Sequence, residues 1–134
     1  MSKILYHYTT EHHLPHILET GFLKLTDSML KKDDKTYKPV VWLTSQKELT
    51  NNDIGQVGAG VDKTQIRIHI KKQQNFKHWN VFSKKYRKND KEWFDAVEKG
   101  CSAEFWWVSE EIITLDDILL IENKYDGTIY FDNR

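Results

Sequence analysis

The tripeptide His7-Tyr8-Thr9 is the first part of the sequence whose side chains suit chemistry better than packing. An imidazole followed by two hydroxyl groups can donate and accept several hydrogen bonds, as a bound polar ligand requires. The tripeptide is expected at the end of a strand over residues 3–8, directly before a short helix. Taken alone, the pattern also fits a histidine whose hydrogen bonds are satisfied within a strand.

Trp42, Thr44 and Ser45 belong to a second segment with features of a site, the apolar stretch 40–45. A flat indole ring can stack on another flat ring, and it attracts one that carries positive charge. The two hydroxyls could add hydrogen bonds to a ligand. A tryptophan buried in the core and hydroxyls packed at a strand end are the alternative interpretation.

Glu104 is the candidate reactive group in the third segment, residues 102–108. It opens an expected strand of apolar and aromatic residues, where an unpaired carboxylate is costly unless it lines a cleft. That cost favours a site. Glu110 and Glu111 are rival carboxylates, although a solvated loop suits this pair better.

Hydrophobic patterns predict the elements that would position these residues. A short amphipathic helix with Pro15 in its first turn is expected to stop at Gly21. Residues 64–72 alternate between apolar and polar side chains, which predicts a half-buried strand. Residues 118–121 and 128–131 are expected to form a hairpin.

Further elements are expected between these. Strands are predicted over 40–44 and 104–108, and residues 46–63 are expected to form a flexible loop that can close over a ligand. Trp79, Phe82 and Tyr86 share one face of a predicted helix, and a second helix after Asn89-Asp90 places Trp93 and Val97 one turn apart. Because a strand and helix come first and a run of strands comes last, the order favours an α+β fold.

Composition indicates one globular domain over residues 1–134, with 39% hydrophobic and 13% aromatic residues. The single cysteine, Cys101, excludes an internal disulfide and favours a reducing compartment. No apolar run is long enough for a signal peptide or a membrane span. We therefore expect a cytoplasmic protein that does not associate with membranes.

Charge is uneven along the chain, although the formal net charge is zero. Residues 61–91 hold ten Lys or Arg against two Asp, whereas residues 104–134 hold eight acidic residues against two basic ones. The two regions could neutralise each other. Alternatively, the basic segment 63–91 could form a face that contacts phosphates, as in nucleic-acid binding.

The three segments, taken in this order, resemble the NAD-using ADP-ribosyltransferases of the His-aromatic-Glu branch. The local similarity is to DNA-modifying toxins of the DarT type. It is carried by Tyr6-His7-Tyr8-Thr9, by Leu14-Pro15 and the helix stopping at Gly21, and by the Ala103-Glu104 strand. The resemblance implies a split, twisted β-sheet with short covering helices, with NAD bound between its strands.

The resemblance also implies a role for each candidate residue. His7 would bond a ribose hydroxyl of NAD, Tyr8 would receive the nicotinamide carboxamide through its backbone, and Thr9 would support the turn. Trp42 would stack on nicotinamide, although many of these enzymes have tyrosine there. Glu104 would be the catalytic carboxylate, stabilising positive charge on the ribose as the nicotinamide bond breaks.

These expectations lead to transfer of ADP-ribose from NAD to a macromolecule, either a nucleic acid or a protein, with release of nicotinamide. A non-catalytic module that binds a nucleotide, nucleic acid or protein is the alternative, because a fold does not guarantee its chemistry. No metal site is predicted. His12, His13 and His16 lack the intervening glutamate of a metalloprotease helix, and the glycines at 55–60 fit no phosphate-binding loop.

Overall fold

Short strands and two α-helices make up the described chain, as expected for an α+β protein. The computed structural model describes residues 3–26, 31–32, 35–36, 39–48, 63–99 and 103–134. In chain order the elements are β1 (Ile4–Thr9), α1 (Leu14–Thr20), β2 (Phe22–Leu23), β3 (Lys31–Lys32), β4 (Lys35–Thr36), β5 (Val41–Thr44), β6 (Ile66–Lys71), β7 (Lys77–His78), α2 (Trp79–Glu98), the 3-10 helix η2 (Ala103–Phe105), β8 (Trp106–Ser109), β9 (Ile113–Thr114), the 3-10 helix η3 (Leu115–Asp117), β10 (Ile118–Asn123) and β11 (Ile129–Asp132).

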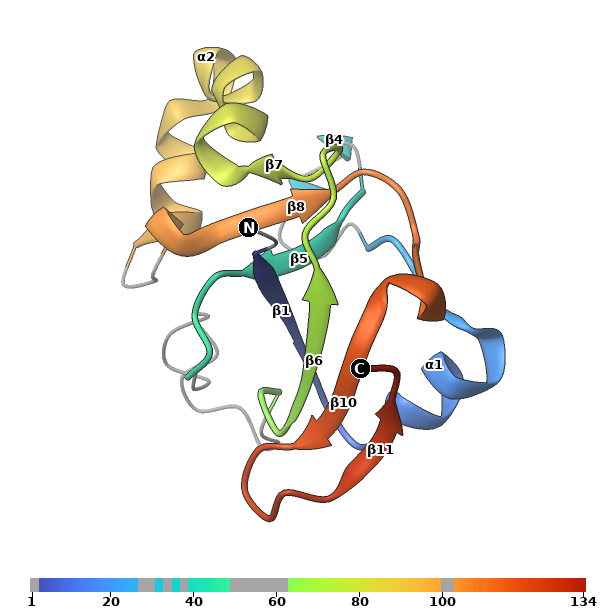
Figure 1. Cartoon of the computed structure of the whole chain (residues 1–134). Coiled ribbons are helices and arrows are strands. Elements are labelled where there is room, and N and C mark those ends of the chain that lie inside the picture. Colours follow the sequence, from blue (N-terminus) through green and yellow to red (C-terminus); the bar gives the residue numbers. More distant parts are fainter. Residues whose placement is uncertain (1–2, 27–30, 33–34, 37–38, 49–62, 100–102) are drawn as a thin grey trace.

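The main sheet of the described residues has seven strands in the order β11-β10-β6-β1-β5-β8-β7, with antiparallel neighbours throughout. β1 is aligned with β6 along six residue pairs but with β5 at the single pair Tyr6–Thr44. Figure 1 shows that β5 and β8 run at a steep angle to β6 and β10. The sheet therefore consists of a four-stranded part ending at β1 and a three-stranded part beginning at β5.

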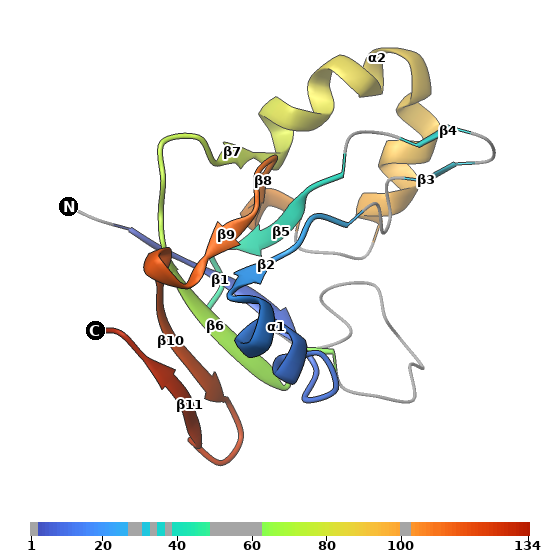
Figure 2. The ribbon, with the colours of Figure 1, turned by 90° about the vertical axis from the view of Figure 1, so that its right-hand side faces the viewer.

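One face of the sheet packs against α1, and we call it the α1 face. Leu5, Leu43 and Ile68 point to it and form one buried cluster with Leu14 and Ile17 of the helix. In Figure 2, α1 lies beside β1 and β6, at the end of the molecule away from α2. The strand predicted over residues 64–72 is confirmed as β6, with its isoleucines fully buried, but it is more than half-buried, because Arg67 on the opposite face is only 7% exposed.

The opposite face packs against α2 at its three-stranded part, and we call it the α2 face. Trp42, Trp106 and Val108 point to it, where they meet Trp79 and Phe82 of the helix. Residues paired directly across antiparallel strands point to the same face. Tyr6 therefore shares the α2 face with its two partners, Thr44 and His69.

Several predicted boundaries are confirmed within one or two residues. Gly21 ends α1 in the left-handed conformation with φ of 82°, and Pro15 lies in the first helical turn. The C-terminal hairpin is present as β10 and β11, with a second left-handed glycine, Gly127, in its turn. The predicted break near Asn89-Asp90 appears as a kink in one assigned helix, because Asp90 has non-helical φ and ψ of −137° and 44°.

The helix predicted after Asn89-Asp90 is present, with Phe94 buried and Trp93 partly buried against the cluster on the α2 face. One prediction needs correction. Glu104 does not open a strand: it lies in η2, and β8 starts at Trp106. The turn is held by His78, whose Nε2 donates to the Glu104 carbonyl at 2.8 Å, and by the Ser45 amide, which donates to the Phe105 carbonyl at 3.0 Å.

Candidate functional site

His7 lies at the junction between the two parts of the sheet. Its Nδ1 is 2.7 Å from the carbonyl oxygen of Trp42 on β5. Because a carbonyl only accepts, Nδ1 carries the hydrogen and donates it, which leaves Nε2 as the acceptor of a neutral ring. His7 is paired with Ile68, so its ring belongs to the α1 face. Among the described residues, Nε2 has no hydrogen-bond partner.

A pocket of about 310 Å³ opens at the end of β1, beside this junction. Hydroxyl, imidazole and amine groups line it: Tyr8, Thr9, Thr10, His12, His13 and Lys63. The volume is at the lower end of the range of about 300–1,000 Å³ for ligand pockets. Two of the predicted cofactor-binding residues, Tyr8 and Thr9, therefore face a cavity that suits part of a polar ligand.

The Tyr8 phenol anchors the pocket to the segment that follows β5. It donates toward the carbonyl oxygens of Gln46, at 3.1 Å, and of Lys47. Burial raises the pKa of Tyr8 well above its usual range, although nearby Arg67 opposes the shift. The phenol therefore stays protonated and acts as a donor.

Trp42 lies on the opposite face of the sheet from the His7 ring. Its indole is partly buried and packs on Trp79 and Trp106, with ring centroids 5.2 and 5.6 Å away. The carbonyl of Trp42 meets His7, but its side chain points to the aromatic cluster under α2. The structure thus joins these two predicted residues through the Trp42 backbone and separates their side chains.

The remaining predicted residues lie at the far end of β5. Thr44 is buried, and its hydroxyl accepts from the Gln46 amide at 3.1 Å, while Ser45 is exposed. Glu104 is also exposed and does not line the pocket. The desolvation argument for Glu104 as a site residue is therefore wrong, since its carboxylate is in solvent.

Of the rival carboxylates, Glu110 forms an ion pair with Lys77 at 2.7 Å and Glu111 accepts from Asn75 at 3.2 Å. Cys101 and the glycines at 55–60 lie outside the described residues.

Sequence reasoning missed a charged network on the α2 face of β6 and β10. Glu122 accepts from Arg67 Nε at 3.2 Å and from His69 Nε2. Arg67 also donates to the Lys47 carbonyl at 2.8 Å, beside the Tyr8 phenol. Arg67 and His69 were recognisable as the polar face of a strand, but Glu122 is 55 residues away from Arg67. Only the register of β10 against β6 brings them together.

The network changes the titration of its members. Burial alone would raise the pKa of Glu122, but the hydrogen bonds from His69 and Arg67 outweigh it and lower the pKa. Burial lowers the pKa of His69 despite its bond to Glu122. At neutral pH the network therefore contains a carboxylate, a guanidinium and a neutral imidazole.

Comparison with protein-family models, with curated proteins and with solved structures finds no match. In the described part of the chain, no helix has the length and apolar character needed to cross a membrane. The same residues contain no group of three or more His, Cys, Asp or Glu side chains arranged to hold a metal ion. Functional assignment therefore depends on individual residues and their geometry.

The partly buried position of His7 predicts a pH dependence of stability. Burial lowers the pKa of His7 below the ordinary value of 6.5, although the Trp42 carbonyl opposes this. Below pH 6.5 the unfolded chain then binds more protons than the folded chain, so stability falls as pH falls. We expect His7→Gln, which can still donate to the carbonyl, to reduce this slope between pH 7 and 5 in urea titrations. The control is the same glutamine substitution at His16, which is exposed. An equal slope for wild type and His7→Gln would contradict the prediction.

Proposed function

We propose that this chain transfers ADP-ribose from NAD to a macromolecular acceptor, with release of nicotinamide, on a split, twisted sheet of the ADP-ribosyltransferase kind. One observation carries the proposal: the pocket at the end of β1 is lined by Tyr8 and Thr9, which directly follow His7 in the same strand. The single residue pair between β1 and β5 is compatible with a split sheet. The pocket and the single residue pair are structural features, and they support the resemblance independently of the amino-acid composition.

The pocket side chains suit a dinucleotide. Outside the residues that line the pocket, the Nε2 of neutral His7 can accept a hydrogen bond from a ribose hydroxyl, as the resemblance implies. Thr10, His12 and Lys63 offer a hydroxyl, an imidazole and a cation to the pyrophosphate. A volume of about 310 Å³ suits part of NAD, so the rest would extend along the surface.

Glu104 keeps the catalytic role in this proposal. As the nicotinamide bond breaks, positive charge develops on the ribose, and a carboxylate nearby stabilises that charge and can orient the nucleophile. A hydrogen bond from His78 to its backbone carbonyl holds Glu104 in η2. This turn precedes β8, which is the second strand from β1 in the sheet. Glu104 does not line the pocket at the end of β1.

Nicotinamide release from NAD tests the proposal. The purified chain is incubated with NAD alone, and then with single-stranded DNA, RNA or protein extract as acceptor. We expect release to fall by about 100-fold or more in Glu104→Gln, the loss typical of a missing acid–base or charge-stabilising group. Glu111→Gln is the matched control, since Glu111 is also an exposed carboxylate near β8.

Two results would contradict parts of the proposal. Full activity in His7→Ala would exclude the proposed ribose contact. Full activity in Glu104→Gln would remove the catalytic assignment, and Glu122→Gln would then be tested, since Glu122 is paired with Arg67, which lies near the Tyr8 phenol. No release under any condition would exclude the enzyme.

A non-catalytic binding module is the second candidate. The opposite orientation of the His7 and Trp42 side chains favours it, because an imidazole and an indole on different faces cannot hold the same ribose and nicotinamide. A module of this kind would bind a nucleotide, a nucleic acid or a partner protein without turnover. Binding measured by calorimetry without nicotinamide release would favour the module over the enzyme.

A further inference from the structure

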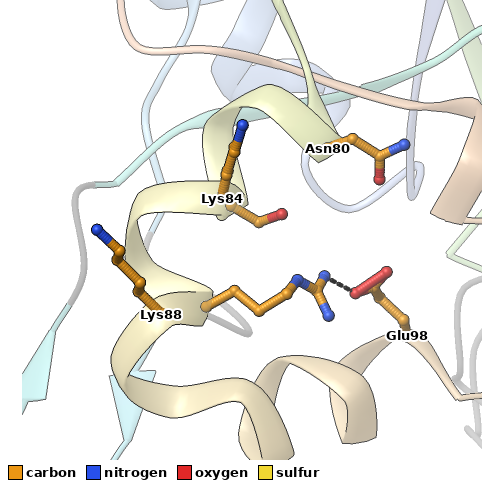
Figure 3. A pocket seen from close by; sticks show the side chains of 6 residues that line it. Asn80, Lys84, Lys88 and Glu98 are labelled. Atoms are coloured by element: carbon orange, nitrogen blue, oxygen red, sulfur yellow. Dashed lines mark hydrogen bonds and ion pairs between the residues drawn. The ribbon is translucent and has the colours of Figure 1, made fainter.

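The pocket at the end of β1 differs from a larger cavity at the kink in α2, which has a volume of about 440 Å³. The described lining of the larger cavity is Asn80, Ser83, Lys84, Arg87, Lys88 and Glu98. Figure 3 shows that the amines of Lys84 and Lys88 point away from it and that an ion pair joins Arg87 to Glu98. None of these lining residues carries an aromatic ring, whereas Tyr8 lines the pocket at β1. A flat ligand ring therefore suits the β1 pocket better.

The Tyr8 hydroxyl is committed to the protein. It donates toward the carbonyl oxygens of Gln46 and Lys47. Arg67 donates to the same Lys47 carbonyl at 2.8 Å and is itself paired with Glu122, so this acceptor is held in place. A phenol has one hydrogen to donate. Tyr8 therefore offers the pocket a positioned, flat ring rather than a free donor.

Trp42, the aromatic residue expected to stack on nicotinamide, does not line this pocket. Its indole packs on Trp79 and Trp106 in the cluster under α2. Aromatic side chains stack on the flat faces of nucleotide rings with little dependence on their hydrogen-bonding groups. The stacking role thus passes from Trp42 to Tyr8.

Charges around the pocket favour a neutral ring over a cationic one. Lys63 lines the pocket, and the Lys124 ammonium lies 5.7 Å from the centroid of the Tyr8 ring. Arg67 is balanced by its two carboxylate partners. The described lining contains no carboxylate, and the neighbouring Glu11 is exposed and is not part of it. Because like charges repel, the cationic nicotinamide ring of NAD is disfavoured here and the neutral adenine ring is not.

We propose that the pocket at the end of β1 holds the adenine base of a nucleotide, stacked on the Tyr8 ring, and not the nicotinamide ring. This inference rests on the proposed function for the identity of the nucleotide as NAD, but the site itself does not require turnover. It departs from the resemblance, which implies that the Tyr8 backbone receives the nicotinamide carboxamide. The nicotinamide end of NAD then lies outside the pocket, as Glu104 does.

The separate halves of NAD test which ring the pocket takes. Calorimetry on the whole chain measures the Kd of AMP and of nicotinamide mononucleotide, which both carry one phosphate. We expect AMP to bind about tenfold more tightly or better, because only its base can stack on Tyr8 without meeting like charge. Nicotinamide mononucleotide that binds as tightly as AMP would overturn the inference, and so would the absence of AMP binding.

Tyr8→Leu and Tyr8→Phe separate the ring from the hydroxyl. Both variants lose the bonds to the Gln46 and Lys47 carbonyls, but only Tyr8→Phe keeps an aromatic face. We expect Tyr8→Leu to bind AMP about tenfold more weakly than Tyr8→Phe, as for other base–aromatic stacks. At saturating AMP, the adenine H2 and H8 proton resonances should shift upfield in wild type and Tyr8→Phe but not in Tyr8→Leu. Equal affinities and equal shifts in the two variants would overturn the inference.

Lys63→Gln tests the orientation of the nucleotide. Because Lys63 is exposed at the pocket, its loss should weaken AMP binding by about fivefold, the upper end for a solvent-exposed ion pair, and leave adenosine binding unchanged. Lys84→Gln removes the same charge at the α2 cavity and should change neither. Equal losses of AMP affinity in the two variants would indicate general attraction of charge and would overturn the inference.

The outcomes also separate the adenine site from the proposed enzyme. AMP binding with these variant effects but without nicotinamide release would retain the site and reject the enzyme. Nicotinamide release with a KM for NAD that is unchanged in Tyr8→Leu would retain the enzyme and reject the site.

Discussion

Trp79→Ala should lower the free energy of unfolding by about 3–5 kcal/mol, the cost of truncating a large buried aromatic side chain. Trp79 is fully buried at the start of α2. Its ring lies 5–6 Å from those of four neighbours, with centroid distances of 5.2 Å to Trp42, 5.5 Å to Trp106, 5.8 Å to Phe94 and 5.9 Å to Phe82. Its loss would remove the contact that holds α2 on β5 and β8.

Urea unfolding followed by circular dichroism would measure this loss. Val81→Ala is the control in the same helix, since Val81 is 65% exposed and should change stability by less than about 0.5 kcal/mol. Trp79→Phe should lose less than Trp79→Ala, because it keeps most of the ring and removes an indole N–H without a partner among the described residues. A loss below about 1 kcal/mol in Trp79→Ala would mean that α2 does not depend on this contact.

Glu122→Ala is expected to cost about 3 kcal/mol, because removal of one partner from a buried ion pair leaves the other charge uncompensated. The side chain of Arg67 is 8% exposed and that of Glu122 is 17% exposed. Arg67 would retain the Lys47 carbonyl and the Glu48 carboxylate, which keeps the cost at the lower end. The control Glu48→Ala should cost less than about 1 kcal/mol, since the side chain of Glu48 is 83% exposed.

The same substitution should change the response to acid. The pKa of Glu122 is lower in the folded chain than its ordinary value of 4.5, so its contribution is complete above pH 4.5 and is lost as pH falls below it. Urea midpoints between pH 6 and 3 should therefore decline less steeply in Glu122→Ala than in wild type. A parallel decline would show that Glu122 is not stabilised as a carboxylate.

Local patterns predicted the elements well. Alternating isoleucines identified β6, and Gly21 and Pro15 identified the end and start of α1, because each signal depends on neighbours in sequence. The α+β class followed from the order of elements. Patterns of this kind need no knowledge of tertiary contacts.

The candidate site was harder to predict, because it depends on register and on faces. Sequence cannot tell that His7 and Trp42 point to opposite faces, which is decided by the pairing of β1 with β5. The strand expected at Glu104 is a 3-10 turn, held by contacts with His78 and Ser45 from other elements. The bond between Arg67 and Glu122 likewise requires β10 to align with β6.

β5 has a consequence for folding that follows from its two faces. Val41 and Leu43 belong to the cluster under α1, while Trp42 packs against the cluster under α2. Each cluster could otherwise act as a separate cooperative unit, since β1 and β5 share one residue pair. This four-residue strand therefore couples the two units, and its backbone amides should exchange with solvent only when both open.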